Sequence, residues 1–105
     1  MQSITRGTTP KIRIGLPTGL AVSDIAELWL TLKQGSVSID KALEDMSDEG
    51  EGLLSVTLSQ TETLRLDENG GAVCVQVRLR TRSGEAAATE IVVGSAAAIL
   101  RDGEI

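Results

Sequence analysis

The chain has 105 residues, 10 of them Lys or Arg and 15 Asp or Glu, which gives a net charge of -5. It has no His, so Ser-His-Asp and Cys-His catalytic arrangements are excluded, and its acidic balance argues against binding to the phosphate backbone of nucleic acids. Phe and Tyr are also absent, so a core must be aliphatic, with Trp29 as the only aromatic residue and Cys74 as the only cysteine.

The polar residues 1–9 predict a flexible N-terminal arm, and residues 10–105 are expected to form a single domain. Residues 11–16 alternate between apolar and charged or small side chains, which is typical of a strand with one buried face. Residues 17–19 then predict a turn. The domain is therefore expected to begin with a half-buried strand.

Residues 25–34 predict a second strand. Leu28, Leu30 and Leu32 would face the core, because successive side chains of a strand point to opposite faces. Trp29 would then face outward, covered either by the chain's own loops or by another molecule. Trp29 is therefore the first candidate interaction residue.

A tight turn at residues 34–36 predicts a hairpin with a third strand that begins at Val37. Residues 40–46 fit a helix or a strand, and we expect a strand through about Leu43. Residues 47–52 are expected to form a loop. The acidic side chains of segment 40–51 could hold calcium, but their spacing does not match an EF-hand loop, and a solvated acidic surface is the simpler interpretation.

Residues 54–58 predict another strand. Ser59 and Glu62 follow it with the spacing of a capping box, in which each side chain accepts a hydrogen bond from the other residue's backbone. This pattern predicts a short helical turn near residues 60–64. Residues 67–71 then predict a turn before the next strand.

Residues 73–80 show the clearest alternation in the chain, with one apolar and one polar face, as in an antiparallel sheet that is solvated on one side. Arg78 and Arg80 lie on the polar face and are the other candidate interaction residues, because a cationic stripe could bind an anion or an acidic partner. The simpler interpretation is an ordinary solvated strand face, on which Arg discourages pairing between sheet edges.

A three-residue loop at 82–84, with Gly84 in the left-handed conformation, is expected to join this strand to a partner at 89–93. The expected cross-strand pairs are Val75 with Ile91, Val73 with Val93, and Gln76 with Glu90.

Together these elements predict an all-β fold, an antiparallel β-sandwich of about seven short strands that is immunoglobulin-like. No catalytic residue, cofactor-binding residue or metal ligand can be assigned, so we expect a protein that is not an enzyme and needs no cofactor. The N-terminal residues lack the apolar core of a signal peptide, and no segment approaches the ~20 apolar residues of a membrane helix.

Five segments of the chain carry a resemblance to a known family: residues 5–10, 24–32, 56–64, 75–78 and 100–105. In this order and spacing the chain resembles short proteins from the structural-gene regions of phages and prophages of Gram-positive bacteria. It departs from them in lacking Phe in the strands. The resemblance brings no catalytic residues with it.

The resemblance implies a structural protein of the virion or tail, located in the cytoplasm of the bacterial host during assembly and then in the virion. Its expected partners are other phage structural proteins or further copies of itself in a homo-oligomer, and neither nucleic acid nor a membrane is expected. The alternative is a small module that binds a carbohydrate or an anion.

Overall fold

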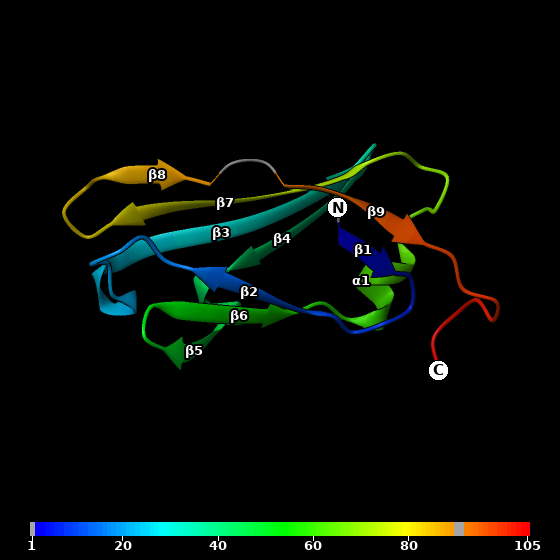
Figure 1. The fold of residues 1–105 in the computed structure, drawn as a ribbon, viewed down its shortest axis with the longest axis horizontal. Helices are drawn as coiled ribbons and strands as arrows, with labels where there is room; N and C mark the ends of the chain where they lie inside the picture. Colours follow the sequence, from blue (N-terminus) through cyan, green and yellow to red (C-terminus); the bar gives the residue numbers. More distant parts are fainter. Residues whose placement is uncertain (1, 90–91) are drawn as a thin grey trace.

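The computed structural model describes residues 2–89 and 92–105. Strands make up 50% of it and helical segments 11%. The strands form one sheet of six strands and one of three, which lie over each other (Figure 1). The expected all-β class is confirmed.

The larger sheet has the strand order β1-β9-β7-β3-β4, and β8 pairs with β7 on the same edge as β9. Its strands are β1 (Gln2–Thr5), β3 (Ile25–Gln34), β4 (Val37–Ala42), β7 (Val73–Thr81), β8 (Ala86–Ala88) and β9 (Val92–Ala97). The smaller sheet has the order β2-β6-β5. Its strands are β2 (Lys11–Gly15), β5 (Ser47–Gly50) and β6 (Leu53–Thr57).

The core lies between the two sheets. On the inner face of the larger sheet, β3 and β7 pair antiparallel, and their apolar residues stand opposite one another: Leu28 with Leu79, Leu30 with Val77, and Leu32 with Val75. Leu28 and Leu30 share a buried cluster with Ile14, Leu54 and Val56 of the smaller sheet. The alternation expected along both strands is therefore confirmed, because one face of each is buried against another layer.

A second buried cluster lies beside α1 (Gln60–Leu64), and it includes Leu32, Leu58, Leu66, Val73 and Ala96. The expected capping box is present, since the Ser59 hydroxyl accepts from the Glu62 amide at 3.1 Å and the Glu62 carboxylate accepts from the Ser59 amide at 2.8 Å. No helix in the described parts of the chain is long and apolar enough to cross a membrane.

The segment at residues 2–5 differs from the flexible arm that its composition predicts. It forms β1, which pairs in parallel with β9 and sets Ile4 opposite Ala96. Arg6 follows it, and its guanidinium donates hydrogen bonds to the carbonyl oxygens of Leu64 and Leu66 at the end of α1. The segment is ordered because its backbone pairs with a sheet edge and Arg6 caps a helix end.

The acidic region also differs from its prediction. The strand expected through Leu43 ends one residue earlier, and a 3-10 turn (Leu43–Asp45) follows it. The loop expected at residues 47–52 contains β5, which pairs antiparallel with β6. All four residues of β5 are exposed, so the sequence has no alternation of apolar side chains from which this edge strand could be predicted.

The hairpin after β7 has the expected loop, with Gly84 at a φ of 97° and its amide bonded to the Thr81 carbonyl at 3.0 Å. Farther along, β9 is shifted by one residue. Val73 lies opposite Gly94 and Val75 opposite Val92, so the pairs Val73–Val93 and Val75–Ile91 are wrong. The predicted pair Gln76–Glu90 lies outside the described residues.

A side-chain hydrogen bond precedes this shift. The Val77 amide donates to the Thr89 hydroxyl at 3.0 Å, and the Thr89 amide donates to the Val77 carbonyl at 2.9 Å. The β8 register would continue to Thr89, and β9 then starts with one extra residue relative to β7. Val93 consequently lies beside Cys74 on the outer face, where it is 47% exposed.

Candidate interaction face

The three candidate residues lie together on the outer face of the larger sheet. In the β3–β7 register, Trp29 stands opposite Arg78 and Glu27 opposite Arg80. On its other side Trp29 stands opposite Ala42 of β4. We call the surface formed by Glu27, Trp29, Arg78 and Arg80 the Trp29 face. Directly opposite side chains have Cβ atoms about 4.5–5.5 Å apart, so these four residues form one patch.

Trp29 is 42% exposed, whereas the leucines on either side of it in β3 are fully buried. Its indole N–H donates to the Glu27 carboxylate at 2.7 Å. The other oxygen of that carboxylate lies 3.7 Å from the Arg80 guanidinium. The Glu27 carboxylate therefore contacts the indole ring and Arg80 at the same time. Much of the Trp29 side chain stays exposed to solvent and could contact a partner.

The charges of the Trp29 face are mixed. The Arg80–Glu27 pair is more than half exposed on both sides, so it contributes at most about 1 kcal/mol to folding. In the described parts of the chain, Arg78 has no ion pair. Arg78 is exposed and adds a cationic guanidinium to this face.

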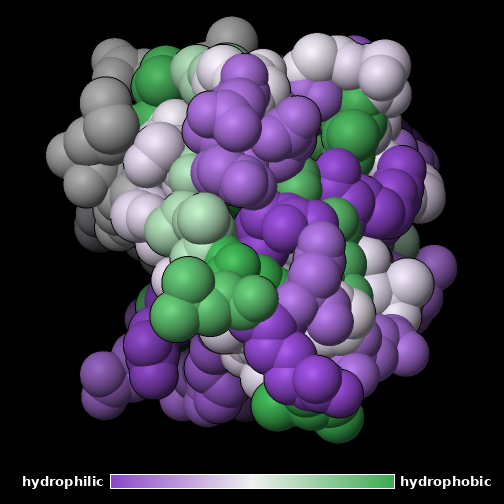
Figure 2. Space-filling model, turned by 90° about the vertical axis from the view of Figure 1, so that its right-hand side faces the viewer, coloured by the Kyte–Doolittle hydropathy of each residue, from purple (hydrophilic) through white to green (hydrophobic). Residues whose placement is uncertain are grey.

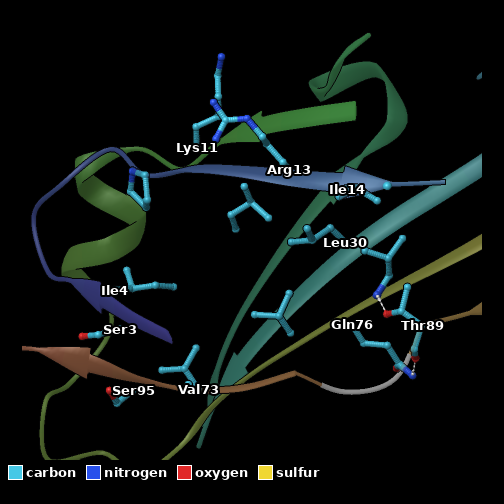
Figure 3. A pocket seen from close by; sticks show the side chains of 16 residues that line it. Ser3, Ile4, Lys11, Arg13, Ile14, Leu30, Val73, Gln76, Thr89 and Ser95 are labelled. Carbon is cyan, nitrogen blue, oxygen red and sulfur yellow. Dashed lines mark hydrogen bonds between the residues drawn. The ribbon is translucent and has the colours of Figure 1, made fainter. Parts of the chain in front are cut away.

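A cavity of about 510 Å³ lies between the two sheets, beside β2 (Figure 3). Its apolar lining comes from both sheets: Ile4, Ile12, Ile14, Leu30, Val73, Val75 and Val77. Gln76 and Thr89 border it at one end, but the Gln76 side chain lies on the outer face of β7, where it donates to the Thr89 carbonyl at 3.0 Å. Lys11 and Arg13 also border it, but their side chains point away from it (Figure 3).

No pattern in the sequence predicted this cavity. Alternation assigns Ile12 and Ile14 to a buried face, but it does not reveal where two packed sheets leave space between them. The lining has no aromatic residue, because the one aromatic side chain of the protein lies on the other face of the larger sheet.

One end of the long axis of the molecule carries α1 and the C-terminal segment (Figure 1). It is mostly hydrophilic, and its hydrophobic residues form small separate patches (Figure 2). The C-terminal segment includes the exposed residues Leu100 and Ile105. Its last residues are held by Gln60, whose amide bonds to the backbone of Ile105 at 3.1 and 2.9 Å.

Glu49, in the acidic segment 40–51, contacts other side chains of the same chain. In the described ranges, no group of three or more His, Cys, Asp or Glu residues is placed to hold a metal ion. Glu49 accepts a hydrogen bond from the buried Ser55 hydroxyl at 2.5 Å and lies 3.4 Å from the Lys11 ammonium. The bond from Ser55 and the charge of Lys11 lower the pKa of the Glu49 carboxyl below its ordinary value. These contacts favour the interpretation of a solvated acidic surface.

No protein-family model matches the chain, and no match is found among curated proteins or solved structures.

Proposed function

We propose that this chain is a non-enzymatic association protein that binds another protein through the Trp29 face. The observation that carries the proposal is the position of the single aromatic side chain, which is 42% exposed on the open face of the larger sheet. With the resemblance described above, we propose a structural protein of a phage or prophage virion or tail, whose partners are other structural proteins or a second copy of the chain.

The chemistry of the face suits a protein partner. Trp and Arg are the residues most enriched among those that dominate binding energy at interfaces. The Glu27 carboxylate already orients the indole through its N–H, so binding would cost less side-chain entropy than it would for a free ring. We expect the partner to offer an apolar pocket for Trp29 and a carboxylate for Arg78.

We also propose that the fold is an immunoglobulin-like β-sandwich of the variable type. The strand order β9-β7-β3-β4 corresponds to G-F-C-C′ and the order β2-β6-β5 to B-E-D. Two hallmarks differ, since the chain has no cysteine pair and the Trp of the C-like strand points outward instead of into the core. The second difference leaves Trp29 exposed on the outer face.

The test compares two exposed apolar residues on the same outer face, Trp29 and Val93, which is 47% exposed. Binding to proteins encoded by flanking genes, and self-association by light scattering over a range of concentrations, would be measured for wild type, Trp29→Ser and Val93→Ser. We expect Trp29→Ser to weaken binding at least about tenfold, as loss of a dominant interface residue does. We expect Val93→Ser to leave it nearly unchanged.

Equal effects of the two substitutions, or no association of the wild type with any of these proteins, would remove the support for this proposal. If instead a panel of glycans or anions quenched Trp29 fluorescence with no change in oligomeric state, the alternative of a carbohydrate- or anion-binding module would be favoured.

A further inference from the structure

The free edge of β2 is the second surface that could receive a partner. β2 is the outer strand of the smaller sheet and pairs with β6 on one side only. At the two ends of this pairing, the Leu58 amide donates to Pro10 and the Leu16 amide donates to Gly52. Because backbone hydrogen bonds alternate along an antiparallel pair, the even-numbered residues of β2 bond to β6.

The odd-numbered residues of β2 therefore direct their backbone groups the other way. Lys11, Arg13 and Gly15 present N–H and C=O groups along the free edge, and in the described parts of the chain no strand pairs with them. Such a row of backbone donors and acceptors is a template for one more strand.

The cavity lies on the inner side of this edge. Ile12 and Ile14 of β2 line it together with Leu30 and Val77 of the larger sheet, and Ile14 lies on the side of β2 that faces Leu30 (Figure 3). A strand added beside β2 would send alternate side chains in the same direction as Ile12 and Ile14. The volume of the cavity, about 510 Å³, falls within the range of about 300–1,000 Å³ that ligand pockets have.

The charges on the outer side of β2 indicate the chemistry of the partner. Lys11 and Arg13 are exposed there and point away from the cavity. Lys11 has one weak contact with Glu49 at 3.4 Å, and no ion pair of Arg13 is found among the described residues. Acidic residues opposite them on an added strand would be favourable, since opposite charges in cross-strand pairs stabilise a sheet.

The same charges argue against a second copy at this edge. If two β2 strands paired antiparallel, the Lys11 and Arg13 side chains of one copy would lie across from or diagonal to those of the other. Like charges in these positions destabilise the pairing.

The geometry points to an extended segment of another protein that adds to the free edge of β2, with apolar side chains at alternate positions in the cavity and acidic side chains between them. This mode of recognition uses backbone hydrogen bonds for affinity and side-chain pockets for specificity. The surface belongs to the smaller sheet, so this inference and the proposal for the Trp29 face can fail separately.

The experiment titrates the full chain with a capped eight-residue peptide of alternating Val and Glu, and it follows backbone amides by NMR and hydrogen exchange. We expect the amides of Lys11, Arg13 and Gly15 to become protected. A peptide of alternating Val and Lys should bind about tenfold more weakly, because attractive pairs are replaced by like charges.

Two controls separate the parts of the inference. N-methylation of the Val/Glu peptide on its bonding edge should abolish the protection, and the double substitution K11E/R13E should reverse the preference between the two peptides. The substitution Lys33→Glu, on the outer face of the other sheet, should leave the preference unchanged, and so should Trp29→Ser.

Three results would overturn the inference. The first is equal binding of the Val/Glu and Val/Lys peptides by the wild type. The second is protection of the same amides by a rise in protein concentration alone, which would make a second copy the occupant. The third is a cavity that binds an apolar small molecule while no peptide protects the β2 edge.

Discussion

The Lys41 ammonium lies 2.8 Å from the Glu62 carboxylate and joins β4 to the first turn of α1. Both side chains are about one-fifth exposed. Burial raises the pKa of the Glu62 carboxyl, but the hydrogen bonds from Lys41 and from the Ser59 amide outweigh it, so this pKa lies below the ordinary value of 4.5. A carboxyl with a lowered pKa stabilises the folded state above its unfolded pKa, and this stabilisation is lost as the pH falls through the folded pKa.

We expect Glu62→Gln to lower the free energy of unfolding by about 0.5–1 kcal/mol at pH 7, because Gln still caps the helix but cannot pair with Lys41. The difference from wild type should close as the pH falls below 4.5, the ordinary pKa of the carboxyl. Urea unfolding at a series of pH values measures it. Glu44→Gln is the control, since Glu44 is exposed and has no ion pair among the described residues. A constant difference down to pH 2 would contradict the expectation.

The buried amide of Gln34 organises the turn before β7. It donates to the carbonyls of Asp67 and Gly71 at 2.6 and 3.0 Å, and it accepts from the Asp67 amide at 2.8 Å. Gln34→Leu would leave three backbone groups without partners, so we expect a loss of about 2–3 kcal/mol in urea unfolding. Gln76→Leu, which removes a single hydrogen bond to the Thr89 carbonyl, should cost less than about 1 kcal/mol. Similar costs at both positions would count against this account of the turn.

Arg6 fastens β1 to the end of α1 through hydrogen bonds to Leu64 and Leu66 and a contact of 3.8 Å with Glu68. We expect Arg6→Met to cost about 1.5–3 kcal/mol, the range for hydrogen bonds to charged groups, and to speed hydrogen exchange in β1 and β9 before other strands. Arg101→Met is the control, because Arg101 is exposed and has no hydrogen bond or ion pair in the described ranges. Unchanged exchange in β1 would show that the strand is held by its backbone pairing alone.

Gly84 and Gly15 form a matched pair of glycines. A Cβ atom at either position would meet nothing within 4 Å, but Gly84 has a φ of 97° and Gly15 has no positive φ. We expect Gly84→Ala to cost about 1–2 kcal/mol, since the left-handed conformation is unfavourable for a residue with a Cβ atom. Gly15→Ala should be neutral or stabilise by up to about 1 kcal/mol. Thermal unfolding of the two variants compares them, and equal shifts would exclude backbone conformation as the cause.

Alternation predicted the faces of β3 and β7 because both strands lie inside a sheet that is buried on one side. The same reasoning could not find β5, whose residues are all exposed, or β1, in which Ile4 is the one large aliphatic side chain. The shift between β8 and β9 follows a hydrogen bond to the Thr89 side chain, and no periodicity encodes such a bond.

Trp29 was predicted separately from the stripe of Arg78 and Arg80, and their grouping needed the structure. Sequence places Trp29 and Arg78 on outward faces of separate strands, but the partner of each strand is a long-range choice that local pattern does not reveal. The β3–β7 register brings the two residues opposite each other and gives the indole its acceptor, Glu27. The β2 edge and its cavity are likewise products of how the two sheets are stacked.

The parallel pairing of β1 with β9 has a consequence for the order of folding. β1 pairs with β9, so the backbone of Gln2 can pair with that of Gly94 only after nearly the whole chain has been synthesised. Contacts so distant in sequence carry a large loop-closure cost and slow the folding of all-β proteins. We therefore expect the pairing of β1 with β9 to be among the last contacts of the larger sheet to form during translation.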